Sequence, residues 1–264
     1  MSAVLYEVHQ RVATLTLNRP ESLNAVNPAM IAALLATSAA AADDPAVRAV
    51  IVRGAGQHFM AGGDLKWFRA QTALPEADRR IRFVELIEGV HAAVLNFKRM
   101  DKPVIAAVHG AVAGFGLSLM LAADLVLAAD DAYFTLAYNN IALSPDGGGT
   151  WSLPRHVGLK RAMEIALLGE RFDAERAEQL GLVNHVYPAE RLPGEAVKLA
   201  QRLAAGPARA LAHTKSLLNA SFDHALAEHL RLEQANFADC AAHPDFVEGL
   251  NAFLEKRPPS YRHD

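Results

Sequence analysis

Residues 102–116 read KPVIAAVHGAVAGFG, and this stretch decides the fold. Its first half, Pro103–Val108, is a continuous apolar run of the kind found in strands that are buried on both faces. Two glycines, Gly114 and Gly116, follow before a second apolar run of helical character begins. Glycine accepts the backbone angles of a tight turn and lets backbone N–H groups point outward. The stretch therefore predicts a strand, a turn with exposed N–H donors and a helix.

A second glycine turn lies at Ala61–Leu65, where AGGDL follows the apolar run Ala49–Val52. Two such turns, brought together, would aim two N–H groups at one point, as a negatively charged oxygen requires. Glycine turns also simply connect strands to helices, so either turn alone is a weak signal of function. The two together favour an enzyme with an oxyanion hole.

Patterns elsewhere in the chain predict an α/β fold. Strands are expected at 4–8, 12–17, 124–128 and 133–135, and helices at 28–42, 80–100 and 117–121. Asn27 before Pro28 is a suitable start for the first helix. Apolar residues at helical spacing, including Phe83, Ile87 and Val90, make 80–100 an amphipathic helix. Strand pairs followed by helices indicate α/β architecture, and 69–79 carries no clear pattern and looks mobile.

Strand patterns disappear from about residue 189, and helices then follow one another. Gly206-Pro207 interrupts this region. Four apolar side chains lie on one helical face: Phe222, Leu226, Leu230 and Phe237. We therefore predict a core over residues 1–188 and a helical region over 189–264. The sequence leaves open whether the helical region covers the core or contacts another subunit.

Composition excludes several classes of protein. The 264 residues are 52% hydrophobic, which suffices for a large buried core, and the net charge of −3 gives no basic surface for nucleic acid. No run is long enough to cross a membrane, and the N-terminus does not resemble a signal peptide, so we expect a cytoplasmic protein. The single Cys240 excludes an intrachain disulfide, and the eleven histidines lack metal-ligand spacing, so no metal is expected.

The segment Ser144–Trp151, SPDGGGTW, adds a carboxylate to the two glycine turns. Asp146 is either an ordinary turn or helix-capping residue, or a carboxylate beside apolar surface. In the second case desolvation raises the pKa of the carboxyl group and suits it to moving a proton. Thr150 is a candidate cap for a helix that continues through Trp151 and Leu153.

Motifs spread over nearly the whole chain resemble the crotonase, or enoyl-CoA hydratase/isomerase, superfamily. In family order they are LNRPESLNA at 17–25, FMAGGDL at 59–65, KPVIAAVHG at 102–110, AADL at 122–125, PDGGGT at 145–150, GLV at 181–183 and AFLEKR at 252–257. The resemblance implies a spiral of ββα units with a C-terminal helical region that assembles homotrimers, often paired into hexamers. It implies an acyl-CoA substrate and no separate cofactor, since coenzyme A is part of the substrate.

The resemblance also implies roles for individual residues. The N–H groups of Gly63 and Phe115 would form the oxyanion hole and hold the enolate of the thioester. The substrate-binding positions by the same resemblance are Ser22, Leu23, Ala61, Asp64 and Leu65, with Phe253 and Lys256 reaching the coenzyme A of a neighbouring subunit. A lysine near the phosphates of coenzyme A is chemically sensible. Tyr138 is expected to form part of the pocket wall.

Two departures from the family pattern narrow the expected reaction. Hydratases of the family carry glutamates at the positions of Ser118 and Tyr138, and hydration calls for a base that activates water and an acid that protonates carbon. Asp146 falls where isomerases of the phenylacetate pathway place a catalytic aspartate. An isomerase needs only one mobile base, because the proton it removes is the proton it returns.

We therefore predict an acyl-CoA isomerase in which Asp146 is the single acid/base and Gly63 and Phe115 supply the oxyanion donors. The reaction is a proton shift in an unsaturated acyl-CoA, from Δ3- to Δ2-enoyl, or the isomerisation of a ring epoxide to an oxepin. Two alternatives stay open. One is a hydratase or lyase that uses Asp146 and water, and the other is a non-catalytic acyl-CoA-binding homologue.

Overall fold

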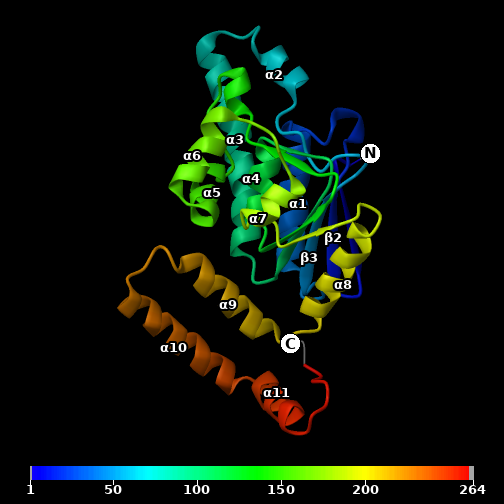
Figure 1. Ribbon diagram of the computed structural model, residues 1–264, viewed down its shortest axis with the longest axis vertical. Helices are drawn as coiled ribbons and strands as arrows, with labels where there is room; N and C mark the ends of the chain where they lie inside the picture. Colours follow the sequence, from blue (N-terminus) through cyan, green and yellow to red (C-terminus); the bar gives the residue numbers. More distant parts are fainter. Residues whose placement is uncertain (1, 262–264) are drawn as a thin grey trace.

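The computed structural model describes residues 2–261 (Figure 1). Its main sheet has six strands in the order β1-β2-β3-β4-β6-β9. The strands are β1 (Val4–His9), β2 (Val12–Leu17), β3 (Ala49–Gly54), β4 (Val104–Val108), β6 (Leu125–Ala129) and β9 (His185–Tyr187). The first two form an antiparallel hairpin, and the other neighbours in the sheet are parallel. The hairpin turns at Gln10 and Arg11, which both have positive φ.

A smaller sheet lies beside the main one and contains β5 (Ala111–Ala113), β7 (Tyr133–Thr135) and β8 (Phe172–Asp173). The chain passes from β4 to β5 through His109 and Gly110. Gly110 has φ +54°, and a Cβ there would lie 2.1 Å from the carbonyl oxygen of Gln57. Only glycine fits this corner, which carries the second glycine turn away from the main sheet.

Helices cover both faces of the main sheet (Figure 1). They are α1 (Pro28–Asp43), α2 (Leu65–Gln71), α3 (Glu76–Arg99), α4 (Phe115–Ala122), α5 (Gly149–Val157), α6 (Leu159–Leu168), α7 (Ala174–Gln179), α8 (Leu192–Ala204), α9 (Ala208–Ala220), α10 (Leu226–Ala242) and α11 (Pro244–Leu254), with short 3-10 helices at Pro20–Ser22 and Tyr138–Ile141. Because side chains alternate along a strand, Ile51 and Ile105 face α8, whereas Val50 and Val104 face the core that includes α1 and α3.

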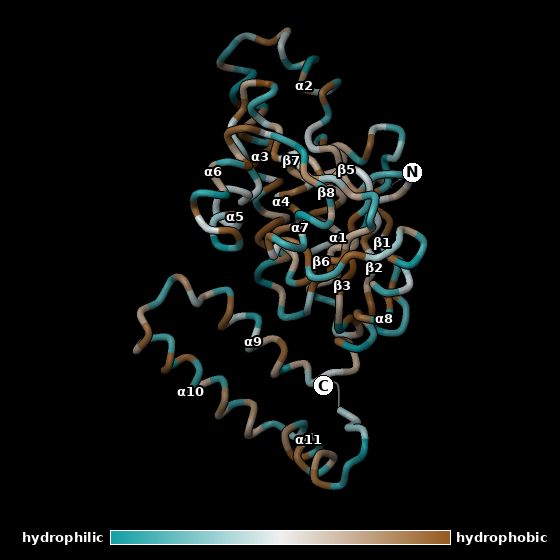
Figure 2. The backbone as a smooth tube through the Cα atoms, viewed as in Figure 1, coloured by the Kyte–Doolittle hydropathy of each residue, from teal (hydrophilic) through white to brown (hydrophobic). Residues whose placement is uncertain are grey.

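The last three helices form an arm that extends from the body (Figure 1). Within the described residues of this arm only Asp245 and Ala252 are buried. Figure 2 shows apolar residues along its whole length. The Lys215 ammonium group attaches α9 to the body by donating to the carbonyl oxygens of Phe97, at 2.9 Å, and Lys102, at 3.0 Å. It also pairs with Asp124 at 2.8 Å.

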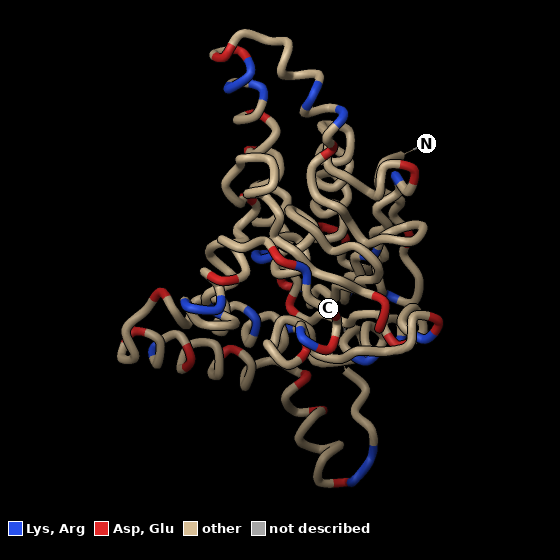
Figure 3. The backbone as a smooth tube through the Cα atoms, turned by 45° about the horizontal axis from the view of Figure 1, so that its top comes forward, with Lys and Arg blue, Asp and Glu red and all other residues tan. Residues whose placement is uncertain are grey.

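Charged residues of both signs are interspersed along the body and the arm (Figure 3). Among residues 2–261, no helix combines the length and the apolar character that crossing a membrane requires. In the same part of the chain, no three His, Cys, Asp or Glu side chains are grouped as a metal site would need.

The structure confirms the α/β architecture, the expected strands and the helical character of the C-terminal region. Three local details differ from the expectations. The segment 69–79 is largely helical, because α2 continues to Gln71 and α3 begins at Glu76. Acidic Glu76 and Asp78 favour that early start, since negative charge stabilises a helix N-terminus. The buried helix expected at 117–121 begins at Phe115, immediately after Gly114. Thr150 caps no helix and lies inside α5.

Candidate active site

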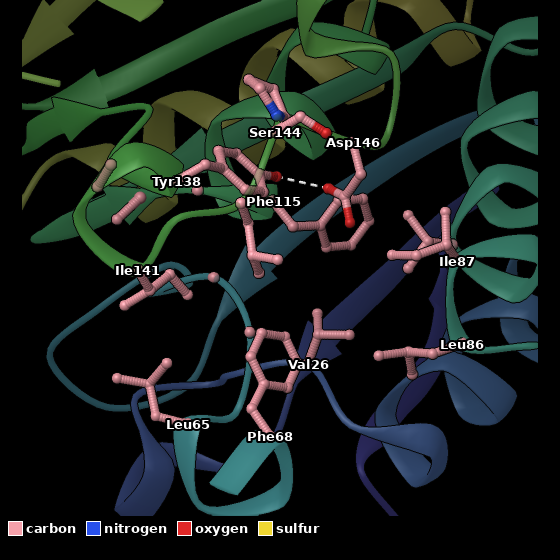
Figure 4. A pocket seen from close by; sticks show the side chains of 18 of the residues that line it. Val26, Leu65, Phe68, Leu86, Ile87, Phe115, Tyr138, Ile141, Ser144 and Asp146 are labelled. Atoms are coloured by element: carbon pink, nitrogen blue, oxygen red, sulfur yellow. Dashed lines mark hydrogen bonds between the residues drawn. The ribbon is translucent and has the colours of Figure 1, made fainter. Parts of the chain in front are cut away.

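A cavity of about 530 Å³ lies where the two glycine turns meet α2 and α3 (Figure 4). Its lining includes residues 61–63 and 113–115 from the turns and, from the segment before α5, residues 137, 138, 140, 141 and 143–146. The opposite wall is apolar and consists of Val26, Leu65, Phe68, Phe83, Leu86, Ile87 and Val90. Asp146 and Phe115 lie at one end of this space, and Phe68 lies at the other (Figure 4). The arrangement places one carboxylate in a mostly apolar pocket.

The two glycine turns are in direct contact. Gly62 has φ +88°, and a Cβ there would lie 3.2 Å from the carbonyl oxygen of Ala113 and 3.5 Å from the Cα of Gly114. The N–H groups of Gly63 and Phe115 donate no hydrogen bond to any residue between 2 and 261. Both residues line the cavity. The structure thus brings two unpaired donors to the same cavity, as an oxyanion hole requires.

Asp146 accepts hydrogen bonds from two hydroxyl groups, and Figure 4 shows the one from Tyr138. Its Oδ1 accepts a hydrogen bond from the Tyr138 hydroxyl at 2.5 Å, and its backbone carbonyl accepts one from the Ser118 hydroxyl at 2.8 Å. Burial raises the pKa of Asp146, although the Tyr138 hydrogen bond and the nearby His91 oppose that shift. Burial and the adjacent Asp146 raise the pKa of Tyr138 well above its usual range, so the phenol stays a donor.

Three consecutive glycines let the Asp146 segment approach α4 closely. A Cβ on Gly147 would lie 2.6 Å from the Phe115 ring, and one on Gly149 would lie 2.7 Å from the Ser118 hydroxyl. Gly148, with φ +79°, is the N-cap of α5, and that helix end receives no side-chain hydrogen bond. The Asp146 carboxylate therefore caps no helix in the described chain, and the glycines serve to bring it to the cavity.

The residues predicted to bind substrate are distributed unevenly around this cavity. Ala61, Leu65 and Tyr138 line it. Leu23 lies beside the first glycine turn, because its carbonyl accepts a hydrogen bond from the N–H of Ala61 at 3.0 Å. Its neighbour Ser22 closes the short 3-10 helix and is within 3.5 Å of the Arg19 guanidinium.

Asp64 has a different environment from the other predicted binding residues. Its carboxylate pairs with Arg19 at 2.9 Å and accepts hydrogen bonds from the N–H groups of Lys66 and Trp67 at the start of α2. Burial alone would raise the pKa of Asp64, but these donors hold it below its usual value. The side chain is thus occupied in fixing α2 next to the first glycine turn.

Phe253 and Lys256 lie at the end of the arm and do not line the cavity of their own chain. The Phe253 side chain is 81% exposed. A role for this pair in binding coenzyme A across subunits stays a prediction.

Sequence reasoning missed the contribution of α3 to the site. Phe83, Ile87 and His91 are spaced four residues apart, so they share one helical face, and all three line the cavity. The spacing was visible in the sequence but indicated only an amphipathic helix. Phe68 and Phe83 pack edge to face with ring centroids 5.0 Å apart, which joins α2 to α3. His91 is the one imidazole that lines this cavity among residues 2–261.

Comparison with known proteins identifies the family of this chain. Residues 7–264 match the family model for enoyl-CoA hydratase/isomerase. A probable enoyl-CoA hydratase of Rhodobacter capsulatus is 39% identical over 98% of this chain and 97% of its own length. The 1,2-epoxyphenylacetyl-CoA isomerase of Escherichia coli is 37% identical over 99% of this chain and 98% of its own.

A solved structure of an enoyl-CoA hydratase from Polaromonas superposes with a TM-score of 0.92 and 39% identity, covering 98% of this chain and 99% of the other. The α/β body with a helical C-terminal region is therefore the crotonase fold. The match extends over the body, both glycine turns and the arm. This chain belongs to the enoyl-CoA hydratase/isomerase family of the crotonase superfamily.

Proposed function

We propose that the protein is an acyl-CoA isomerase that moves a proton within an unsaturated acyl-CoA. One observation carries the proposal: Asp146 is the only carboxylate that lines the cavity among residues 2–261, and it shares that cavity with the unpaired N–H groups of Gly63 and Phe115. A single carboxylate suffices for isomerisation, because one group both removes and returns the proton.

The proposed reaction of a Δ3-enoyl thioester proceeds through a dienolate. The thioester oxygen accepts hydrogen bonds from the N–H groups of Gly63 and Phe115, which stabilise the negative charge that develops there. The Asp146 carboxylate removes a proton from C2, and the electron pair of that C–H bond moves toward the thioester oxygen. The Asp146 carboxyl group then gives the proton to C4, a C2–C3 double bond forms, and the thioester carbonyl is restored.

Isomerisation of a ring epoxide to an oxepin is the second substrate class within this proposal. It also leaves the atoms of the substrate unchanged, and the name of the Escherichia coli relative supports it. The aromatic rings of Phe68 and Phe83, packed edge to face, provide an apolar aromatic wall that can contact a cyclic acyl group.

Hydration remains the second candidate function, since the Rhodobacter capsulatus and Polaromonas relatives are named as hydratases. In that reaction Asp146 would activate a water molecule for attack on C3 of a Δ2-enoyl thioester. The same carboxyl group would also have to supply a proton to C2. Hydration also needs a water molecule held and activated beside C3 while C2 is protonated, whereas isomerisation needs no second reactant. With one carboxylate lining the cavity among residues 2–261, hydration is the weaker candidate.

The deciding experiment incubates the purified protein with a 3-enoyl-CoA and, separately, with a 2-enoyl-CoA, and follows products by liquid chromatography and mass spectrometry. The proposal expects a product of unchanged mass from the first and no reaction with water from the second. A product heavier by one water would identify a hydratase. If neither thioester reacts, the same assay is repeated with a ring-epoxide acyl-CoA, and tight binding of all three thioesters without any product would identify a non-catalytic homologue. Asp146→Asn is the matched inactive control.

For the assembly, we propose a homotrimer or a pair of trimers in which Phe253 and Lys256 contact the coenzyme A of a neighbouring subunit. The exposed apolar side chains of the arm support this proposal, because a monomer would leave them in water: Leu218, Phe222, Leu226, Leu230, Phe237 and Phe253. Multi-angle light scattering measures the mass in solution. A Lys256→Met variant tests the contact, with weaker coenzyme A binding as the expected result.

A further inference from the structure

We propose that Tyr138 and Ser118 are positioning residues that fix the side chain and the backbone of Asp146 and leave a single carboxylate oxygen to carry the proton. The inference rests on the proposed function, because the choice of oxygen matters when one group must serve two carbons of the substrate. It concerns how Asp146 is held rather than which acyl group is bound.

The Tyr138 hydroxyl donates a hydrogen bond to Oδ1 of Asp146, and Tyr138 lies in a strained turn. The 3-10 helix that carries it, Tyr138–Ile141, lies between Ala137 with φ +36° and Ala142 with φ +56°. Left-handed alanines are unfavourable and persist only where the surrounding structure imposes them. A Cβ on Gly114 would lie 3.9 Å from the Tyr138 ring. The ring thus packs beside the second glycine turn while its hydroxyl points to Asp146 (Figure 4).

Ser118 holds the backbone of the same aspartate. It lies on α4 with only 1% of its surface exposed, and its hydroxyl donates to the Asp146 carbonyl oxygen at 2.8 Å. The α-carbons of Gly147 and Gly149 pack against it so closely that neither position has room for a Cβ. The side chain and the main chain of Asp146 are therefore fixed by two hydroxyl groups from two different elements.

The second oxygen of Asp146 accepts no hydrogen bond from any other residue between 2 and 261. In Figure 4 it points away from Tyr138 into the cavity. The ionisable groups that face Asp146 are Tyr138, from the 3-10 helix, and His91, from α3. Since the phenol stays protonated, it cannot exchange roles with the carboxylate. The proton therefore leaves the substrate and returns to it through the free oxygen.

Tyr138→Phe tests the proposal, because it removes the hydroxyl and keeps the ring. We expect kcat to fall about 10- to 100-fold with little change in KM, the size of a lost hydrogen bond to a charged group. The pKa of Asp146 should rise, since a donor to the ionised form is gone, and the acid limb of the rate profile should move to higher pH. Tyr133→Phe is the matched control, because Tyr133 lies on β7 and does not line the cavity. It should leave kcat and the acid limb of the rate profile unchanged.

Two further measurements separate positioning from other roles. In an Asp146→Asn background, Tyr138→Phe should cause no additional loss of kcat, because Tyr138 acts through Asp146. An additive loss of kcat would mean that Tyr138 acts on the substrate directly and would overturn the proposal. Ser118→Ala should lower kcat, whereas Ser38→Ala, which removes a buried serine in α1, should affect stability alone.

Carbon NMR of labelled aspartate, assigned with Asp146→Asn, measures the pKa of Asp146 without any substrate. A higher value in Tyr138→Phe supports the positioning role, and an unchanged value overturns it. The NMR titration does not depend on activity. An absence of isomerase turnover in the wild-type protein would therefore count against the proposed function and not against the positioning role.

Discussion

At the scale of single residues, the ionisation of Asp146 is decided by opposing effects. Burial favours the protonated acid, whereas the Tyr138 hydroxyl and the His91 ring favour the ionised form, and burial is the larger effect. A carboxyl group with a raised pKa holds a proton more firmly than a surface aspartate does, which helps it return that proton to carbon. The same burial destabilises the ionised carboxylate, which is the form that removes the proton from the substrate.

Asp146→Asn should abolish most turnover and stabilise the fold. We expect kcat to fall by at least about 100-fold, the usual size of acid–base catalysis, while acyl-CoA binding persists. The pKa of Asp146 is higher in the folded protein than in the unfolded chain. The wild-type protein therefore loses stability as the pH rises from the lower of these two values through the higher one. The asparagine of the variant does not ionise, so the variant does not lose this stability. Its Tm should exceed that of the wild type at pH 8, and the difference should vanish near pH 3. Wild-type turnover in this variant would remove Asp146 from the mechanism.

His91→Gln should shift the pH dependence of activity. A protonated His91 stabilises the ionised carboxylate of Asp146, so its removal raises the pKa of Asp146. The acid limb of the kcat/KM profile should therefore move to higher pH, while the rate at alkaline pH stays near that of the wild type. The control is His9→Gln, at the exposed end of β1. An unshifted acid limb would show that His91 does not act on Asp146.

At the scale of elements, the site depends on two turns that touch. In the proposed mechanism the two turns hold the oxyanion together, and their contact is possible because Gly62 carries no side chain. The α2–α3 pair then forms the opposite wall, held by Asp64 at the start of α2 and by the packing of Phe68 on Phe83. The order of these elements along the chain does not reveal that contact.

Gly62→Ala should separate the turns. The new Cβ would press on the carbonyl of Ala113 and occupy a left-handed backbone position, so the paired N–H groups lose their alignment. We expect kcat to fall about 100-fold or more, the effect of losing one oxyanion donor. Gly181→Ala is a matched control, since Gly181 also has positive φ but a Cβ there would meet no atom within 4 Å. It should lose about 1 kcal/mol of stability and keep its activity.

At the scale of the whole molecule, the arm α9–α11 is joined to the body through few buried groups. Lys215 is the main polar attachment that the described residues show, with a side chain 8% exposed and paired with Asp124. Burial lowers the pKa of Lys215, and Asp124 opposes that shift. The orientation of the arm, and with it the proposed assembly, depends on this contact.

Lys215→Met should release the arm. Removing the Lys215 ammonium group leaves Asp124 without its ion-pair partner and two backbone carbonyl groups without this donor. Such a loss typically lowers the free energy of unfolding by about 3 kcal/mol. Urea unfolding should show the loss, and light scattering should show a smaller assembly. Lys198→Met is the control, because Lys198 is 82% exposed and its pair with Glu195 contributes at most about 1 kcal/mol. A stable, fully assembled Lys215→Met variant would contradict the role of this attachment.

The local patterns of the chain predicted much of this structure. Apolar runs predicted β2, β3 and β4, the Asn27-Pro28 pair predicted the start of α1, and the glycines predicted both turns. The sequence predicts that Thr150 caps a helix, because a hydroxyl group near a helix start is a common cap. That expectation is wrong, because α5 begins one residue earlier, at Gly149, where the glycine segment packs on α4. The helices in segment 69–79 escape prediction because their signals are acidic residues rather than apolar periodicity.

The sequence by itself determined the family, the strands β1–β4, β6 and β7, the two glycine turns and the presence of a carboxylate at position 146, because the signals for these lie in short segments. The short strands β5, β8 and β9 carry no such signal and escape prediction. The tertiary structure alone decided that the turns touch, that α3 brings His91 to the same cavity as Asp146, and that Tyr138 and Ser118 hold that aspartate. These contacts join residues distant in the chain or on separate elements, and burial, which sets the pKa of Asp146, exists only once the elements have packed.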